Sequence, residues 1–342
     1  MDPAQATNIG AQITAIEHAL PKRKVSNAEL AELHPEWQMT QVVLRTGVES
    51  RYWCGRDETA LDLAEAACRK LMSRAGVDLT QVEVLLFCTQ SADYVMPPNA
   101  CLLQHRLGLP RTVAALDYPL ACSGFIYGLY LASSLVKSQA ARQVLLVTAE
   151  TYSKWCHPDD RGPTTLFGDG AAVTLVSAGK PAIGDFLFST NGSGASCFFV
   201  PAGGARMPRS EETRRPMKDQ NGNIRTLENI HMDAAGVLDF VKRDVPALVR
   251  RLLERTGLTL GDLDLVLFHQ SSKVTLDYLN EALRIPAHKQ VSNIVGVGNT
   301  VSASIPMALR DAELKGVLGP GMRLMLVGFR VGLSSGACLV NW

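Results

Sequence analysis

Three residues far apart in the sequence have types and settings suited to acyl-transfer chemistry. Cys122 lies where the apolar run 113–116 gives way to a helical pattern. A thiolate is favoured there, because the first N–H groups of a helix are unpaired and its dipole is positive. His269 directly follows the apolar run 263–268, and Asn299 lies in a glycine-flanked turn. Such a thiolate can attack a thioester while the imidazole and the amide stabilise negative charge on a carbonyl oxygen.

Two alternatives remain open for these residues on local pattern alone. A cysteine at a strand-to-helix corner is often a buried, inert thiol. A histidine can also serve as the general base of a hydrolase that uses the same cysteine. The choice between these hypotheses therefore depends on the secondary-structure elements that would position the three residues.

Composition restricts the class of protein. The chain has 342 residues, of which 46% are hydrophobic and 20% charged, and its net charge is +1. A large core is therefore expected, and no charge excess favours nucleic acid or a membrane surface. The eight cysteines form no CxxC pair, which favours reduced thiols over disulfides or a metal site. With no evident signal peptide or spanning segment, we expect a cytoplasmic protein.

Apolar runs of strand length alternate with amphipathic helical patterns along the chain, which predicts an α/β fold with a largely parallel sheet. The runs expected as strands include 11–16, 82–88, 113–116, 144–148, 172–177, 263–268, 324–327 and 337–340. We expect 113–116 to be a buried strand. Residues 51–53, which are basic and aromatic, are expected in a solvent-exposed loop. The segment 189–230, rich in Gly, Ser, Pro and Arg, predicts a long surface excursion.

The two halves of the chain are similar at a single offset. Residues 71–79 and 82–87 resemble 252–260 and 263–268, with an offset of 181. The same offset relates two further pairs of segments, namely 142–146 with 323–327 and 121–123 with 302–304. We interpret this as two copies of one α/β unit.

The duplication connects the three chemical residues. His269 is equivalent to Cys88 at a strand end, and the Cys122 corner is equivalent to the turn 298–303. Sites in parallel α/β folds form at the carboxyl ends of strands. A pseudo-twofold would therefore bring Cys122, His269 and Asn299 to one central crevice.

The chain resembles the thiolase superfamily, and more closely its β-ketoacyl synthase III branch of condensing enzymes. The segments that carry the resemblance are 120–125 (LACSGF), 157–162 (HPDDRG), 167–171 (FGDGA), 268–270 (FHQ), 298–304 (GNTVSAS) and 328–336 (GFRVGLSSG). The resemblance implies a duplicated five-layer α-β-α-β-α fold with pseudo-twofold related halves, residues 1–180 and 181–342.

The resemblance also implies roles for the site residues. Cys122 would take an acyl group from acyl-CoA, and backbone N–H groups of Cys122 and Val331 would form the oxyanion hole. His269 and Asn299 would bind a malonyl-type thioester, favour loss of carbon dioxide and stabilise the enolate that attacks the acyl-cysteine. No cofactor beyond the acyl-CoA substrate and no metal is implied.

Binding residues and partners follow from the same resemblance. Arg45 and Arg161 match positions that contact coenzyme A, and Trp37 is the candidate for stacking on adenine. Met96 matches a side chain that closes the acyl pocket of a partner subunit, so a homodimer is expected. An acyl carrier protein is a further candidate partner.

Several positions depart from the housekeeping pattern of that branch. Ser271 and Ser272 replace Ala-Asn after the histidine motif, and Arg330 replaces a small residue. At the expected tunnel mouth the matching positions are Asp239 and Glu281, with Lys273 as the only nearby basic residue. Acidic groups repel an acidic carrier, so these departures favour a specialised pathway. Non-condensing acyl transfer by the same cysteine is the alternative function, and a catalytically silent partner subunit is a further one.

Overall fold

The computed structural model describes residues 9–74, 76–330 and 332–342, and its core is built on two large sheets. The strands of the first sheet, in spatial order, are β1 (Gly10–Ala19), β7 (Gly170–Gly179), β6 (Gln143–Glu150), β4 (Val84–Cys88) and β5 (Ala114–Tyr118). Strand β4 is parallel to β5 and β6, whereas β7 is antiparallel to β6 and β1.

The second sheet repeats this arrangement. Its strands, in spatial order, are β13 (Leu265–Phe268), β14 (Arg323–Arg330), β15 (Ser334–Asn341) and β8 (Ile183–Thr190). The pair β13 and β14 is parallel, and the two following pairs are antiparallel, as in the first sheet. The offset of 181 thus places β13 on β4 and β14 on β6. The chain passes from the first sheet to the second at residues 180–182.

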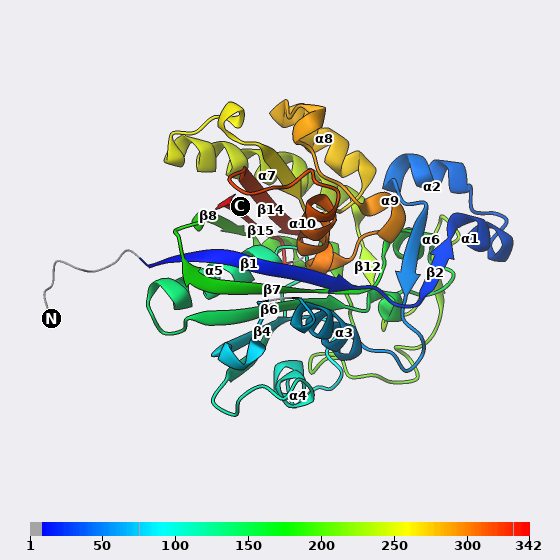
Figure 1. Ribbon diagram of the computed structural model, residues 1–342. Coiled ribbons are helices and arrows are strands. Elements are labelled where there is room, and N and C mark those ends of the chain that lie inside the picture. Colours follow the sequence, from blue (N-terminus) through cyan, green and yellow to red (C-terminus); the bar gives the residue numbers. More distant parts are fainter. Residues whose placement is uncertain (1–8, 75, 331) are drawn as a thin grey trace, which may run out of the picture.

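Helices form three layers around the two sheets, which gives the predicted five-layer fold (Figure 1). Outside the first sheet lie α3 (Ala60–Met72) and α4 (Asn99–Arg106). Between the sheets lie α5 (Gly124–Lys137) and α10 (Ser304–Leu314), whose apolar faces join one core with both sheets. Outside the second sheet lie α7 (Ala234–Thr256) and α8 (Lys273–Leu283).

Shorter elements surround these layers. The helices are α1 (Asn27–Leu33), α2 (Met39–Thr46), α6 (Arg161–Leu166) and α9 (Ile294–Val297). The short strands are β2 (Arg23–Ser26), β3 (Ser50–Trp53), β9 (Phe198–Phe199), β10 (Met217–Lys218), β11 (Ile224–Arg225) and β12 (His231–Met232). The 3₁₀ turns are η2 (Leu79–Gln81), η3 (Tyr152–Trp155), η4 (Gly192–Cys197), η5 (Leu260–Asp262), η6 (Ala287–Lys289) and η7 (Val301–Ala303). The excursion 189–230 contains only such short pieces, as its composition predicts.

Two expectations about burial are wrong. Strand β5 is an edge strand, and Leu116 in it is 42% exposed rather than buried. The apolar run therefore indicates a surface that this single chain leaves uncovered. Residues 51–53 are not a solvated loop, because they belong to β3 and Arg51 is fully buried.

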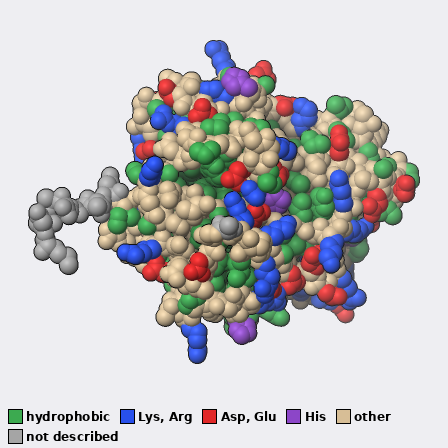
Figure 2. Space-filling model, viewed as in Figure 1, with side chains coloured by type: hydrophobic (Ala, Val, Ile, Leu, Met, Phe, Trp, Pro, Cys, Tyr) green, Lys and Arg blue, Asp and Glu red, His purple; other side chains and the backbone are tan. Residues whose placement is uncertain are grey.

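Surface charge and helix length add little to this picture. On the face shown in Figure 2, basic and acidic side chains are interspersed, in keeping with the net charge of +1. Within the described part of the chain, no helix combines the length and the apolar character needed to cross a membrane.

Candidate active site

Cys122 lies in the short segment that connects β5 to α5, the helix packed between the two sheets. A tight turn closes it, in which Gly124 N–H donates to the carbonyl of Ala121 at 2.7 Å. Cys122 directly precedes the helix N-cap, Ser123, and is 2% exposed. Cys122 therefore lies at the positive end of a 14-residue helix, as the local sequence predicts.

Two glycines allow α5 to approach the first sheet closely. A methyl group at Gly124 would lie 2.3 Å from the sulfur of Cys88, and one at Gly128 would lie 2.2 Å from the hydroxyl of Tyr118. Tyr118 in turn donates to the carbonyl of Gly124 at 2.9 Å. These contacts fix the start of α5, and with it the position of Cys122.

His269 follows β13 and is fully buried. Its backbone N–H donates to the carbonyl of Val327 in β14 at 2.8 Å. Its Nδ1 lies 2.7 Å from the hydroxyl of Ser304, the first residue of α10. The ring of Phe329 meets the imidazole edge-to-face with centroids 5.7 Å apart. Ser304 and Phe329 therefore fix the plane of the ring.

Asn299 is held in its turn by backbone and side-chain hydrogen bonds. Its N–H donates to the carbonyl of Leu166 at 2.9 Å, and its carbonyl accepts from Gly168 N–H at 3.1 Å. Its side-chain oxygen accepts from Val301 N–H at 2.9 Å, and its Nδ2 lies 3.3 Å from the carbonyl of Ser271. The last contact ties the asparagine to the loop that begins at His269.

Strand β14 brings the cysteine and the histidine to the same place. A methyl group at Gly328 would lie 2.9 Å from the carbonyl oxygen of Cys122 and 2.9 Å from Cα of Ser123. The residues on either side of Gly328 hold His269, one by a hydrogen bond and the other by ring packing. Cys122 and His269 therefore pack on three consecutive residues of one strand, and Asn299 is tied to the adjoining loop.

Arg51 supports this arrangement, although its local sequence predicts an exposed loop. Its guanidinium donates to Oδ1 of Asn27 at 2.6 Å and to the carbonyl of Thr165 at 2.7 Å. Burial lowers the pKa of Arg51 to about 10. A methyl group at Gly298, which has φ +71°, would lie 3.1 Å from Cβ of Arg51. Arg51 thus lies directly behind the turn that presents Asn299.

Two buried acids near the site were also missed. Burial raises the pKa of Glu150 to about 8 and that of Asp169 to about 6. Asp169 accepts hydrogen bonds from the N–H groups of Cys54 and Ser153. The available signal for Glu150 was a carboxylate directly after the mostly apolar run 144–149.

The residues predicted to contact coenzyme A lie on neighbouring elements. Arg45 is exposed in α2, Arg161 is the first residue of α6, and the two helices pack together. Trp37 is only 7% exposed, and its ring stacks on His34 with centroids 3.9 Å apart. In this structure the ring of Trp37 therefore packs against another side chain of the same chain.

The remaining predicted positions lie farther out. Met96 is 78% exposed, on a loop beside the edge strand β5. Val331, predicted to complete the oxyanion hole, lies outside the described residues, as does the side chain of Arg330.

The expected acidic tunnel mouth carries both signs of charge. Lys273 contacts Asp277, and Nζ of Lys242 lies 5.3 Å from the ring centroid of Tyr278. Helix α7, which carries Asp239 and Lys242, packs against α8, which carries Lys273 and Glu281. Lys273 is therefore not the only cation near the two acids.

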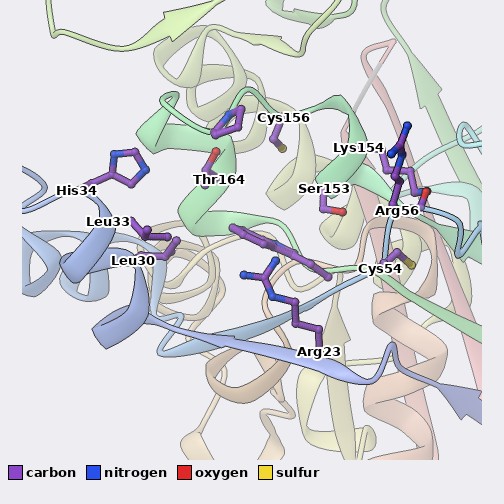
Figure 3. A pocket seen from close by; sticks show the side chains of 13 residues that line it. Arg23, Leu30, Leu33, His34, Cys54, Arg56, Ser153, Lys154, Cys156 and Thr164 are labelled. Carbon is purple, nitrogen blue, oxygen red and sulfur yellow. The ribbon is translucent and has the colours of Figure 1, made fainter.

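Two cavities flank the site. One of about 530 Å³ has Pro119 and Gly332 in its wall and an aromatic lining. Its aromatic residues are Tyr152, Trp155, Phe198 and Phe199. The other, of about 440 Å³, lies between α1, at His34, and the segment that carries Lys154 (Figure 3). It contains none of the predicted site residues.

The fold and the site together define a thiolase-like enzyme class, and comparisons with known proteins agree. Models of 3-oxoacyl-[acyl-carrier-protein] synthase III match residues 116–192 and, for its C-terminal part, 253–342. The synthase III of Syntrophomonas wolfei is 32% identical over 336 residues, 97% of both chains. Synthase III 3 of Streptomyces coelicolor is 33% identical over 337 residues, 96% of both chains.

Solved structures give the same result. A crystal structure of a 3-oxoacyl-(acyl-carrier-protein) synthase III is 44% identical, covers 97% of this chain and 100% of its own, and superposes with a TM-score of 0.95. The priming β-ketosynthase of the R1128 polyketide pathway is 29% identical, covers 97% and 96%, and has a TM-score of 0.85. The chain belongs to the β-ketoacyl-[acyl-carrier-protein] synthase III family of condensing enzymes.

Proposed function

We propose that this enzyme loads an acyl group from acyl-CoA onto Cys122 and condenses it with a malonyl-type thioester. The observation that carries the proposal is the packing of Cys122 and His269 on the same three residues of β14. Asn299, tied to the loop after His269, supplies the second neutral donor.

The residues would act in two half-reactions. In the first, the thiolate of Cys122 attacks the acyl-CoA carbonyl, the bond from the acyl carbon to the coenzyme A sulfur breaks, and coenzyme A leaves as its thiolate. In the second, His269 and Asn299 donate hydrogen bonds to the thioester carbonyl of the malonyl group, and its carboxylate leaves as carbon dioxide. The enolate carbon then attacks the acyl carbonyl, which forms a C–C bond and releases the Cys122 thiolate. The backbone N–H of Cys122, with that of Val331, would hold the oxyanion.

Arg45 and Arg161 are the proposed contacts to the phosphates of coenzyme A. Both cations lie on helices that pack together, and Arg161 also belongs to the segment 157–162 that carries the family resemblance. Trp37 would join them by exchanging its stack on His34 for the adenine ring.

A specialised pathway is proposed for the product rather than a housekeeping one. The aromatic lining of the cavity beside Pro119 and Gly332 suits a bulkier acyl group than acetyl. The mixed charge on α7 and α8 provides no uniform basic surface for an acidic carrier. Non-condensing acyl transfer remains the second candidate, since the same cysteine and cavity would serve it.

Acyl loading is tested by intact-mass measurement. The protein is incubated with a panel of acyl-CoAs that includes acetyl, branched, medium-chain and aromatic donors. We expect one acyl adduct per chain with at least one bulky donor, and none on Cys122→Ala. The Cys68→Ala variant is the matched control, because that buried thiol lies in α3, on the outer side of the first sheet, and should not be acylated. An absence of any adduct on the wild-type protein would contradict both candidate functions.

A homodimer through the edge of the first sheet is also proposed. The apolar residues Val95, Met96 and Leu116 are exposed beside the edge strand β5 (100%, 78% and 42%). An uncovered apolar edge of this kind favours pairing with a second copy. Met96 of one copy would then close the aromatic cavity of the other, which we propose holds the acyl group.

Sedimentation velocity tests this dimer. We expect the wild type to be dimeric at micromolar concentration and Leu116→Arg to weaken the dimer by at least about tenfold. The control is Leu33→Arg, on an exposed leucine of α1. A wild-type protein that sediments as a monomer would rule the dimer out.

A further inference from the structure

Glu150 is a fully buried carboxyl group at the end of β6, where the first sheet meets the turn that presents Asn299. Its two oxygens contact segments from opposite halves of the chain. A carboxyl in such a place costs free energy unless its hydrogen bonds are satisfied.

One oxygen is bound by the segment that follows β4. Oε2 accepts from Gln90 N–H at 3.0 Å and lies 3.0 Å from the hydroxyl of Ser91. The Ser91 hydroxyl oxygen also accepts from Thr151 N–H at 3.1 Å. Gln90 lines the aromatic cavity and accepts a hydrogen bond from the hydroxyl of Tyr152. This side of the carboxyl is therefore linked, through Gln90, to the wall of the aromatic cavity.

The other oxygen is bound by the second half of the chain. Oε1 lies 2.8 Å from the hydroxyl of Ser302, which is itself buried. Ser302 lies in η7, three residues after Asn299 and two residues before Ser304, which contacts the His269 ring. One carboxyl thus connects the sheet that carries Cys122 with the segment that positions both proposed donors.

We propose that Glu150 is a positioning residue for the condensation half-reaction, through its contact with Ser302. It would hold the segment 299–304 at a fixed distance from the sheet that leads to Cys122. The inference rests on the proposed function, in which His269 and Asn299 act only after Cys122 is acylated.

Burial favours the neutral form of this carboxyl and outweighs the hydrogen bonds, which favour its charged form. Burial is the main cause that raises the pKa of Glu150 to about 8, and the charge of Asp169 adds to it. Cys88 and Tyr118 also face it, and the pKa of each is raised by burial. In the structure the Ser302 hydroxyl and the Gln90 N–H both donate to the carboxyl oxygens. A neutral carboxyl can still accept from Gln90, and its O–H can donate to the Ser302 hydroxyl oxygen when that hydroxyl rotates. Glutamine offers the same donor and acceptor, so Glu150→Gln should keep the link.

The test separates loading from condensation. Four variants are compared: Glu150→Gln, Glu150→Ala, Ser302→Ala and Ser91→Ala. We expect all four to load acyl groups at rates within a few-fold of wild type. Carbon dioxide release from malonyl-CoA should fall by about 10²-fold in Glu150→Ala and Ser302→Ala, the usual effect of misplacing a reacting group by about 1 Å. Glu150→Gln and Ser91→Ala should stay within a few-fold.

Hydrogen exchange provides a readout that does not depend on the reaction. Peptides covering 296–304 should exchange faster in Glu150→Ala and Ser302→Ala, and at the wild-type rate in Glu150→Gln. Unchanged exchange in Ser302→Ala would overturn the proposal, whichever reaction the enzyme catalyses. Equal losses of loading and condensation would also overturn it, because they indicate general destabilisation. A wild type that loads without releasing carbon dioxide would refute condensation alone, and the exchange result would still decide the role of Glu150.

The pH dependence of stability gives a second check. The pKa of Glu150 rises from 4.5, its ordinary value, which applies to the unfolded chain, to about 8 in the folded protein. Between pH 4.5 and 8 the folded protein therefore keeps a proton on Glu150 that the unfolded chain has lost. This group therefore makes the folded state less stable as pH rises from 4.5 to 8. The free energy of unfolding of Glu150→Gln relative to wild type should increase over that range. A difference that does not change with pH would contradict the neutral carboxyl. The titration of Asp169 occurs in both proteins and cancels in the difference.

Discussion

We expect His269→Ala to load acyl groups onto Cys122 within a few-fold of the wild-type rate but to lose condensation by about 10²–10³-fold. The magnitude is that of removing one donor to a developing oxyanion. Loading survives because the helix end at Cys122 does not depend on the imidazole. Intact mass measures the first step, and carbon dioxide release measures the second.

Asn299→Ala is the companion variant. It should show the same separation of steps, because Asn299 shares the proposed carbonyl contact. Loading that falls as far as condensation in His269→Ala would instead assign the imidazole the role of base to the cysteine, as in a hydrolase. Hydrolysis of the acyl-enzyme by the wild type would support that alternative.

Gly328→Ala damages both half-reactions. The added methyl group would lie 2.9 Å from the carbonyl oxygen of Cys122 and 2.9 Å from Cα of Ser123, so backbone rather than a flexible side chain must move. We expect loading and condensation each to fall at least about tenfold, since small displacements of reacting groups cost that much or more. Stability should fall by about 1–3 kcal/mol, the usual cost of overpacking.

Gly336→Ala is the matched control, because Gly336 pairs with Gly328 across β14 and β15. Its methyl group would meet side-chain atoms of Phe188 and Ile126 at 3.0–3.1 Å. It should therefore destabilise the protein while keeping loading near the wild-type rate. Wild-type turnover by Gly328→Ala would show that β14 does not set the position of Cys122.

Much of the fold follows from the sequence because the duplication is visible in it. The offset of 181 pairs β4 with β13 and β6 with β14, and the structure has both pairs in equivalent sheet positions. The placement of His269 at a strand end and of Cys122 at a helix start follows from the same pattern. Their common packing on β14 does not, because it depends on the close approach that Gly328 allows.

Burial of polar groups is what the sequence could not predict. Arg51 resembles a surface residue in its local sequence, and only the tertiary contacts with Asn27 and Thr165 account for its position inside. Glu150 is similar, since its partners Ser91 and Ser302 come from distant segments. The burial of β5 was overestimated because an apolar run does not reveal whether its own chain or a second copy covers it.

Carbon dioxide release by the acylated wild-type enzyme tests the central claim most directly. The protein is loaded with the best acyl-CoA donor, freed of excess donor and mixed with carboxyl-labelled malonyl-CoA or a malonyl-carrier thioester. We predict one equivalent of labelled carbon dioxide for each acyl group consumed, together with a 3-oxoacyl thioester two carbons longer. Disappearance of the acyl-enzyme with no carbon dioxide released would contradict condensation and assign the enzyme to simple acyl transfer.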